Sequence, residues 1–134
     1  MGRRKIVKAT SASTVLAAAK LIAARKIGAV MVVDGERLVG IFTERDLAVR
    51  VVARALDVRT TTLGEVMTAN PFTVEPNQPL GYALNLMHEK GFRHLPVVHD
   101  GKPIGIVSSR TAMDPQLEEF VFEEHRRKHF GKSR

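Results

Sequence analysis

The sequence predicts an α/β (α+β) fold of two pseudo-symmetric repeats, each a small sheet flanked by helices, with the repeats packed through their sheets. Shifting the 134-residue sequence by 65 positions places residues 9–47 on residues 74–112 without a gap. Each copy begins with apolar residues at helical spacing, followed by two short apolar runs joined near an Asp-Gly dipeptide. These observations give each copy the order helix, strand, hairpin, strand, helix.

The first element of each copy is predicted as an amphipathic helix, over residues 13–26 and 78–90. Gly28 and Gly91 follow these segments, and glycine commonly ends a helix. The apolar face repeats at the i, i+4, i+7 spacing, with Val15, Ala19 and Ile22 aligned to Leu80, Leu84 and Met87.

Two strands joined by a tight turn come next in each copy. Residues 29–33 and 95–98 are short, apolar and rich in β-branched residues, which is typical of a buried strand. The Asp-Gly dipeptide that follows suits a hairpin because its residues adopt positive φ. The second strand, residues 38–42 or 104–107, then leads into another helix.

These elements divide the chain into four parts. A unit of ~55–60 residues buries too little surface to be comfortably stable alone, so the two copies are expected to pack together. The expected parts are a first repeat with a basic N-terminal tail (1–56), a linker with one helical turn (57–72), a second repeat (73–114) and a C-terminal helix with a basic tail (115–134).

The formal net charge of +7 belongs to the ends of the chain. The chain has 21 Lys and Arg against 14 Asp and Glu, but residues 9–124 hold 12 basic and 14 acidic residues. The body is therefore close to neutral, and the sequence argues against a basic nucleic-acid-binding domain. Nucleic-acid binding by the two basic tails stays open as the alternative function.

Several other classes are excluded by what the sequence lacks. Without cysteine, the chain has no disulfide scaffold, thiolate catalysis or Cys-based zinc site. No run of ~18 apolar residues and no signal-peptide pattern occur, so we expect a cytoplasmic protein that does not associate with membranes.

Catalysis and metal binding are not expected either. Ser108 and Ser109 lack the glycine pattern of a nucleophile elbow, and the chain has no Gly-rich phosphate loop. His125 and His129 have helical i, i+4 spacing but no third ligand, and basic residues separate them. We therefore predict no catalytic residue, no metal site and no required cofactor.

Thr43 and Asp46 stand where the second strand of the first copy gives way to a helix. Free amides at the start of a helix can receive a phosphate, Thr43 can hydrogen-bond it, and the Asp46 carboxylate can accept both hydroxyls of a ribose. The same two residues have the spacing of a capping box, which stabilises a helix without any ligand. On the residues alone the capping box is favoured.

The residues that close each copy carry a family resemblance. Residues 40–47 (GIFTERDL) close the first copy, residues 105–110 (GIVSSR) close the second, and residues 92–98 (FRHLPVV) lie inside the second. With the doubled pattern and the junction LGEVMT before the second copy, the chain resembles a stand-alone tandem CBS-domain protein, or Bateman module. The resemblance covers about residues 5–114.

The resemblance implies a regulatory module that binds AMP, ADP, ATP or S-adenosylmethionine in the cleft between the copies. It also implies a homodimer that acts as an energy or metabolite sensor for a partner protein. It favours the ligand role of Thr43, near a phosphate, and of Asp46, on the ribose. The residues that it implies for the first pocket are Thr43, Arg45, Asp46, Thr73, Val74, Phe92, Arg93 and His94.

A second, related pocket departs from the family pattern. Thr111 stands where the family has the acid that binds ribose, and a threonine cannot accept two hydroxyls as a carboxylate does. We therefore predict one strong pocket per chain. The residues of the weaker pocket are Lys8, Gly28, Ala29, Ser108 and Arg110.

Overall fold

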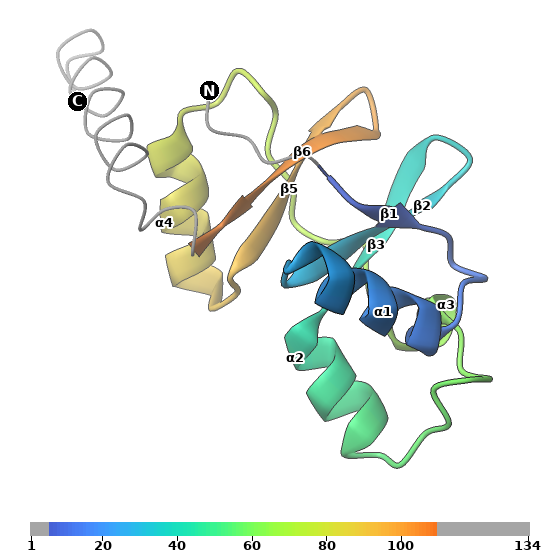
Figure 1. The fold of residues 1–134 in the computed structure, drawn as a ribbon. Helices are drawn as coiled ribbons and strands as arrows, with labels where there is room; N and C mark the ends of the chain where they lie inside the picture. The colour runs from blue at the N-terminus through green and yellow to red at the C-terminus, as the bar shows by residue number, and fades with distance from the viewer. Residues whose placement is uncertain (1–5, 110–134) are drawn as a thin grey trace, which may run out of the picture.

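The computed structural model describes residues 6–109, and Figure 1 shows two repeats that each combine a sheet with helices. The predicted α/β architecture is confirmed. The C-terminal helix expected over 115–134, both basic tails, Arg110, His125 and His129 lie outside the described residues. In chain order the elements are β1 (Lys8–Ala9), α1 (Val15–Arg25), β2 (Ala29–Asp34), β3 (Arg37–Thr43), α2 (Glu44–Asp46), the π-helix η1 (Leu47–Val52), α3 (Leu63–Val66), β4 (Thr68–Ala69), α4 (Leu80–Lys90), β5 (His94–His99) and β6 (Lys102–Ser108).

The two repeats match at the level of single residue pairs. Helix α4 and strands β5 and β6 begin and end 65 residues after α1, β2 and β3. Ala9 pairs in parallel with Val32, and Val74 pairs in parallel with Val97, again 65 residues later. The register of each hairpin shifts directly after Val32 and directly after Val97. The internal repeat seen in the sequence is therefore a repeat of the fold.

The strands of each repeat bury alternate side chains against the helices of the same repeat. In the first sheet, ordered β1-β2-β3-β4, Val30, Val32 and Phe42 pack with Val15 and Ile22 of α1. Side chains of a strand alternate between its faces. Met31 is also buried, 1% exposed, but it does not belong to this cluster. It therefore lies on the face of the sheet that is turned away from α1.

The second repeat repeats this arrangement with the hairpin β5-β6. Leu95 and Val97 pack with Leu80 and Met87 of α4. Helices α1 and α4 lie on the outer sides of the two sheets, and the sheets lie between them (Figure 1). The layers are thus helix, sheet, sheet, helix, as predicted.

The hairpin turns of the two repeats contact each other. The backbone amide of Leu38 donates to the carbonyl of Gly101 at 3.1 Å, and Lys102 Nζ lies 3.2 Å from Glu36 Oε1. The first turn has positive φ at Gly35, and the second at Asp100 and Gly101. The Asp34-Gly35 and Asp100-Gly101 dipeptides therefore occupy different turn positions, in keeping with their separation by 66 residues instead of 65.

The two first helices end differently. Gly91 ends α4 with φ 79°, as the sequence predicts. Helix α1 ends at Arg25, one residue before the predicted end at 26, and Lys26 instead of a glycine takes the left-handed conformation, with φ 54°. Gly28 instead lies against the second repeat, where a Cβ on it would be 2.9 Å from His94 Cε1.

The segment between the repeats packs on the first one. Leu63 and Val66 of α3 are buried in the first core, and β4 pairs with β3. A Cβ on Gly40 would clash with the Met67 side chain and would lie 3.0 Å from the Thr68 carbonyl oxygen. Gly40 therefore lets β4 approach β3 closely. The predicted helical turn in this segment is confirmed as α3.

Candidate functional site

A cleft of about 910 Å³ lies between the repeats. The first repeat contributes the end of β3, α2 and part of η1. The connecting segment contributes β4 and the residues after it. The second repeat contributes the chain from the end of α4 to the start of β5. Its lining residues are Ile41, Thr43, Glu44, Arg45, Asp46, Val49, Arg50, Thr68, Ala69, Asn70, Pro71, Phe72, Lys90, Gly91, Phe92, Arg93 and His94.

Thr43 and Asp46 form a capping box at the start of α2. The Asp46 amide donates to Thr43 Oγ1 at 3.1 Å, while Asp46 Oδ2 accepts from the Thr43 amide at 3.0 Å and from the Thr43 hydroxyl at 3.1 Å. The capping interpretation is thus correct as geometry. Asp46 nevertheless lines the cleft, and its other oxygen, Oδ1, is not used by the cap.

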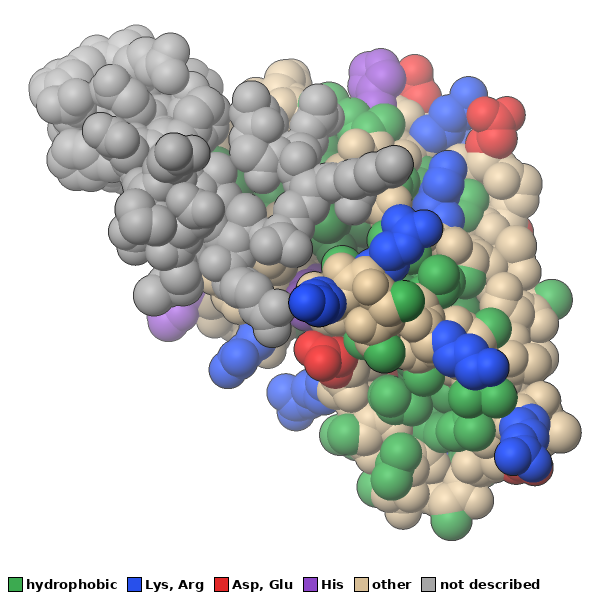
Figure 2. All heavy atoms as spheres, in the orientation of Figure 1, with side chains coloured by type: hydrophobic (Ala, Val, Ile, Leu, Met, Phe, Trp, Pro, Cys, Tyr) green, Lys and Arg blue, Asp and Glu red, His purple; other side chains and the backbone are tan. Residues whose placement is uncertain are grey.

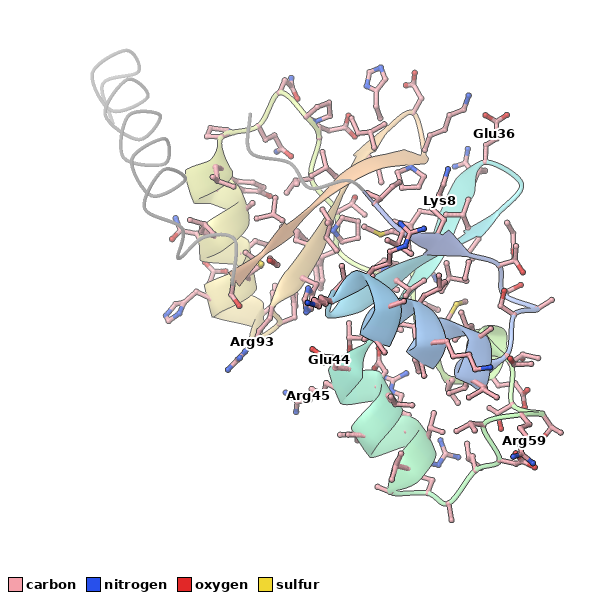
Figure 3. All side chains as sticks on the ribbon, in the orientation of Figure 1. Lys8, Glu36, Glu44, Arg45, Arg59 and Arg93 are labelled. Carbon is pink, nitrogen blue, oxygen red and sulfur yellow. The ribbon has the colours of Figure 1, made fainter. Side chains whose placement is uncertain are left out.

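Charged side chains from both repeats meet at the opening of the cleft. Figure 3 shows Glu44 and Arg45 at the start of α2 beside Arg93, which directly precedes β5. All three are exposed. The cleft lining as a whole contains four Lys and Arg against two acids. An anionic group therefore fits the opening of this cleft better than a cationic one.

Two aromatic rings form the side of the cleft near the second repeat. Phe72 and Phe92 stack with their centroids 5.7 Å apart and their planes at 17°. Lys90 Nζ lies 5.2 Å from the centroid of Phe72, within the range of a cation–π contact. Phe72 is 53% exposed. These rings offer a flat apolar surface next to the cationic opening.

Six of the eight residues expected in the first pocket line this cleft, and two do not. Val74 is buried in the second core, and its backbone is bonded to Pro96 and Val98. Thr73 is exposed and does not line the cleft. The residues that line it are Thr43, Arg45, Asp46, Phe92, Arg93 and His94.

Sequence reasoning missed several lining residues because they lie in the segment read as a linker or on the outer face of a helix. Phe72 directly precedes the predicted Thr73, so an exposed aromatic at this junction was a usable signal. Nothing in the spacing of Arg50, Thr68 or Lys90 pointed to the cleft.

A second, smaller cavity of about 400 Å³ lies next to the cleft and shares some of its lining residues. Gly28, Ala29 and Ser108 of the predicted weaker pocket line it, whereas Lys8 does not. Lys8 is an exposed residue of β1. The second cavity also lacks an aspartate among its lining residues within the part of the chain that is described.

Three residues line both cavities and form the wall between them: Glu44, Arg93 and His94. A Cβ on Gly28 would lie 2.9 Å from His94 Cε1 and 3.0 Å from Glu44 Oε1. The Glu44 amide also donates to the Gly28 carbonyl at 3.0 Å. A larger residue at position 28 would require the ends of the His94 and Glu44 side chains to shift.

Metal binding and membrane insertion find no support in residues 6–109. No group of three His, Cys, Asp or Glu in this part of the chain could hold a metal ion. No helix within it is long and apolar enough to cross a bilayer. The acids whose pKa is lowered, Asp34 and Glu65, line neither cavity.

Comparison with known proteins gives a consistent family match. A model of the CBS domain matches residues 2–53 and again residues 63–115. The "Meiotically up-regulated gene 70 protein" of Schizosaccharomyces pombe is 38% identical over 116 residues, which is 78% of this chain and 16% of that protein. An Arabidopsis thaliana CBS domain-containing protein is 36% identical over 104 residues and is covered over 19% of its length. The chain thus spans less than a fifth of these two curated relatives.

Solved structures share the fold over most of their length. A putative signal-transduction protein with CBS domains from Burkholderia ambifaria is 39% identical, with a TM-score of 0.78, over 88% of this chain and 86% of that one. The CBS domain pair of protein MJ0100, solved in complex with 5′-methylthioadenosine and S-adenosyl-L-methionine, is 29% identical, with a TM-score of 0.72, over 80% of this chain and 87% of that one.

Proposed function

The chain belongs to the CBS domain family, with two copies of the domain, and on this premise we propose that it is a regulatory module that binds an adenosine phosphate in the larger cleft. The observation that carries the proposal is the position of Asp46. Its carboxylate lines the cleft between the repeats, and cationic side chains of both repeats lie at the cleft opening.

The adenosine part of the ligand is supported by a relative. The MJ0100 domain pair holds two adenosine compounds. In this chain, the Asp46 carboxylate is suited to accept ribose hydroxyls, and the stacked Phe72 and Phe92 offer an apolar surface for a purine.

The phosphate part is supported by charge. Arg45 and Arg93 are exposed at the opening, and a guanidinium binds phosphate oxygens through two parallel hydrogen bonds. S-Adenosylmethionine carries a positive sulfonium instead, which the excess of cations disfavours. We therefore rank AMP, ADP and ATP above S-adenosylmethionine for this chain.

Regulation, and not catalysis, is the role we propose. One relative that shares the fold, from Burkholderia ambifaria, is described as a putative signal-transduction protein with CBS domains. The signal passes to a partner protein through a change of shape, which requires the nucleotide to bind two states of the module with different affinity.

We also propose a homodimer. Hydrophobic side chains gather on the surface over α1 and over α2 and η1 (Figure 2). Val49 and Val52 of η1 are 55% and 65% exposed. A second copy of this face would bury both of them.

The smaller cavity is proposed as a weak or empty site. Its lining within residues 6–109 contains no aspartate to take the ribose hydroxyls, so one strong site per chain is expected. The alternative function, nucleic-acid binding, depends on basic tails outside the described residues, and trimming residues 1–5 and 126–134 separates the two: nucleic-acid retention should be lost while adenine-nucleotide binding is kept.

The direct test is a thermal-shift panel with AMP, ADP, ATP, S-adenosylmethionine and NAD. A ligand that binds only the folded state raises the melting temperature by mass action, by an amount that grows with concentration above the Kd. The proposal expects a shift with the adenosine phosphates and a smaller one with S-adenosylmethionine. No shift with any adenosine compound would contradict it.

A further inference from the structure

The two oxygens of the Asp46 carboxylate have different hydrogen-bond partners. Oδ2 accepts two hydrogen bonds from Thr43, at 3.0 and 3.1 Å, and so belongs to the cap of α2. Oδ1 receives the Thr68 hydroxyl at 3.3 Å and lies 3.5 Å from Arg50 Nε. Because the cap occupies Oδ2 with the shorter contacts, Oδ1 is the oxygen available to a ligand in the cleft.

The groups around Oδ1 come from places that the sequence does not connect. Arg50 lies four residues after Asp46, on η1, and π-helical turns are frequent at functional sites. Thr68 lies 22 residues after Asp46, on β4. Arg50 Nη1 also donates to the Met67 carbonyl at 3.0 Å, so the same guanidinium contacts both Asp46 and the start of β4.

We infer that Thr68 and Arg50 are positioning residues, which hold Oδ1 of Asp46 toward the ribose hydroxyls of the ligand. This inference rests on the proposed function. The cap fixes one carboxylate oxygen but leaves the other to be oriented by its own partners. Both residues line the cleft beside Asp46, and Asp46 itself is only 7% exposed. A binding group that is oriented before the ligand arrives binds more tightly, because less freedom is lost on binding.

A consequence is that the segment between the two repeats belongs to the ribose site. Thr68 is held in place by the pairing of β4 with Ile41 of β3. This pairing depends on Gly40, where a side chain would press on Met67 and on the Thr68 carbonyl. The close packing of β4 on β3 thus sets where the Thr68 hydroxyl lies.

The test compares AMP with 2′,3′-dideoxy-AMP, which lacks the ribose hydroxyls. We expect the wild type to prefer AMP, and Thr68→Val to weaken AMP binding by about threefold to tenfold, as for the loss of one hydrogen bond. Binding of the dideoxy compound should stay within about twofold of wild type, because Thr68 acts only through the hydroxyl-binding oxygen. Thr68→Ser, which keeps the hydroxyl, should retain the AMP affinity.

Arg50 gives a second, independent variant. Arg50→Gln should reduce the preference for AMP over the dideoxy compound, and Arg54→Gln is the matched control, since Arg54 is exposed and does not line the cleft. Calorimetric titration measures the affinities, and thermal melting confirms that each variant is folded. If Thr68→Val does not fold, the Arg50→Gln comparison decides the question.

The outcomes separate this inference from the proposed function. A wild type that binds neither compound contradicts the proposed function, and the inference falls with it. If the wild type prefers AMP but the variants keep the full preference, only the role of Thr68 and Arg50 is contradicted. The same holds if the variants lose affinity for both compounds equally.

Discussion

Gly28 and His94 belong to different repeats, yet a Cβ on Gly28 would lie 2.9 Å from Cε1 of the His94 ring. The contact is part of the wall that separates the two cavities. His94 lines both of them, as does Glu44, whose Oε1 would lie 3.0 Å from the same Cβ. Gly28, which the sequence places after a helix and in the weaker pocket, is thus part of the junction between the repeats.

Gly28→Ala should destabilise the protein modestly, by about 1 kcal/mol at most, because the ends of the His94 and Glu44 side chains must shift to admit the added methyl group. The loss should shrink in a His94→Ala background, where the main clashing side chain is gone. Urea unfolding monitored by circular dichroism measures both values.

Gly81→Ala is the matched control for that substitution. Gly81 lies inside α4, and a Cβ there would meet nothing within 4 Å. The change should therefore stabilise the protein by about 0.5 to 1 kcal/mol through helix propensity. Equal effects of the two substitutions would contradict the close packing at Gly28.

Acid should weaken the fold at Asp34. Asp34 Oδ2 accepts from the Ser11 hydroxyl at 2.6 Å and Oδ1 from the Ser11 amide at 3.0 Å, and these hydrogen bonds lower the pKa of Asp34 below its usual 3.8. A lowered pKa means that the charged form stabilises the folded state. This stabilisation is complete above the ordinary pKa and is lost as the pH falls through the lowered value.

The measurement is the melting temperature across the acidic range for wild type and Ser11→Ala. Ser11→Ala should reduce the stability difference between neutral pH and the lowest pH, because the hydroxyl that stabilises the carboxylate is gone. Glu65, whose pKa is lowered by its hydrogen bonds from Thr62, stays intact in both proteins and contributes equally. Identical pH profiles would contradict the role of Ser11.

The aromatic pair at the cleft should show a measurable coupling. Phe72 and Phe92 stack at 5.7 Å, and aromatic pairs contribute about 0.5 to 1.5 kcal/mol beyond burial of their area. A double-mutant cycle with Phe72→Leu and Phe92→Leu should return a coupling free energy in that range. Strictly additive effects would show that the stacking does not stabilise the fold.

The second repeat should depend more on a buried strand position than on an exposed one. Leu95 is fully buried, whereas Ile104 is 41% exposed. Leu95→Ala should cost about 2 to 5 kcal/mol, because it leaves a cavity in the core. Ile104→Ala should cost clearly less. Comparable losses in chemical denaturation would contradict the difference in burial between Leu95 and Ile104.

The elements of the fold could be predicted because local patterns determine them. The 65-residue repeat, the helical spacing around Val15 and Leu80, and the strands that follow all appear in the structure at matching positions. The residue that caps the C-terminal end of α1 could not be predicted, since Lys26 adopts a left-handed conformation that glycine usually supplies.

The site was predictable only where one local motif carries it. Thr43 and Asp46 are three residues apart, so their joint position follows from the start of a single helix. Thr68 approaches Asp46 through the pairing of β4 with β3, and no local pattern encodes that distance. Val74 was expected in the pocket, but its side chain is buried in the second core and its backbone pairs with that of β5.

The most direct test of the central claim is AMP titration of wild type and Asp46→Asn by calorimetry. Asparagine keeps an oxygen that can accept the Thr43 hydrogen bonds of the cap but removes the charge that strengthens bonds to ribose hydroxyls. Glu65→Gln, in the capping box of α3 and outside both cavities, is the matched control. We predict one AMP per wild-type chain, an affinity lowered about tenfold or more in Asp46→Asn, and no change in Glu65→Gln. Wild-type affinity in Asp46→Asn, or two equal AMP sites per chain, would contradict the account.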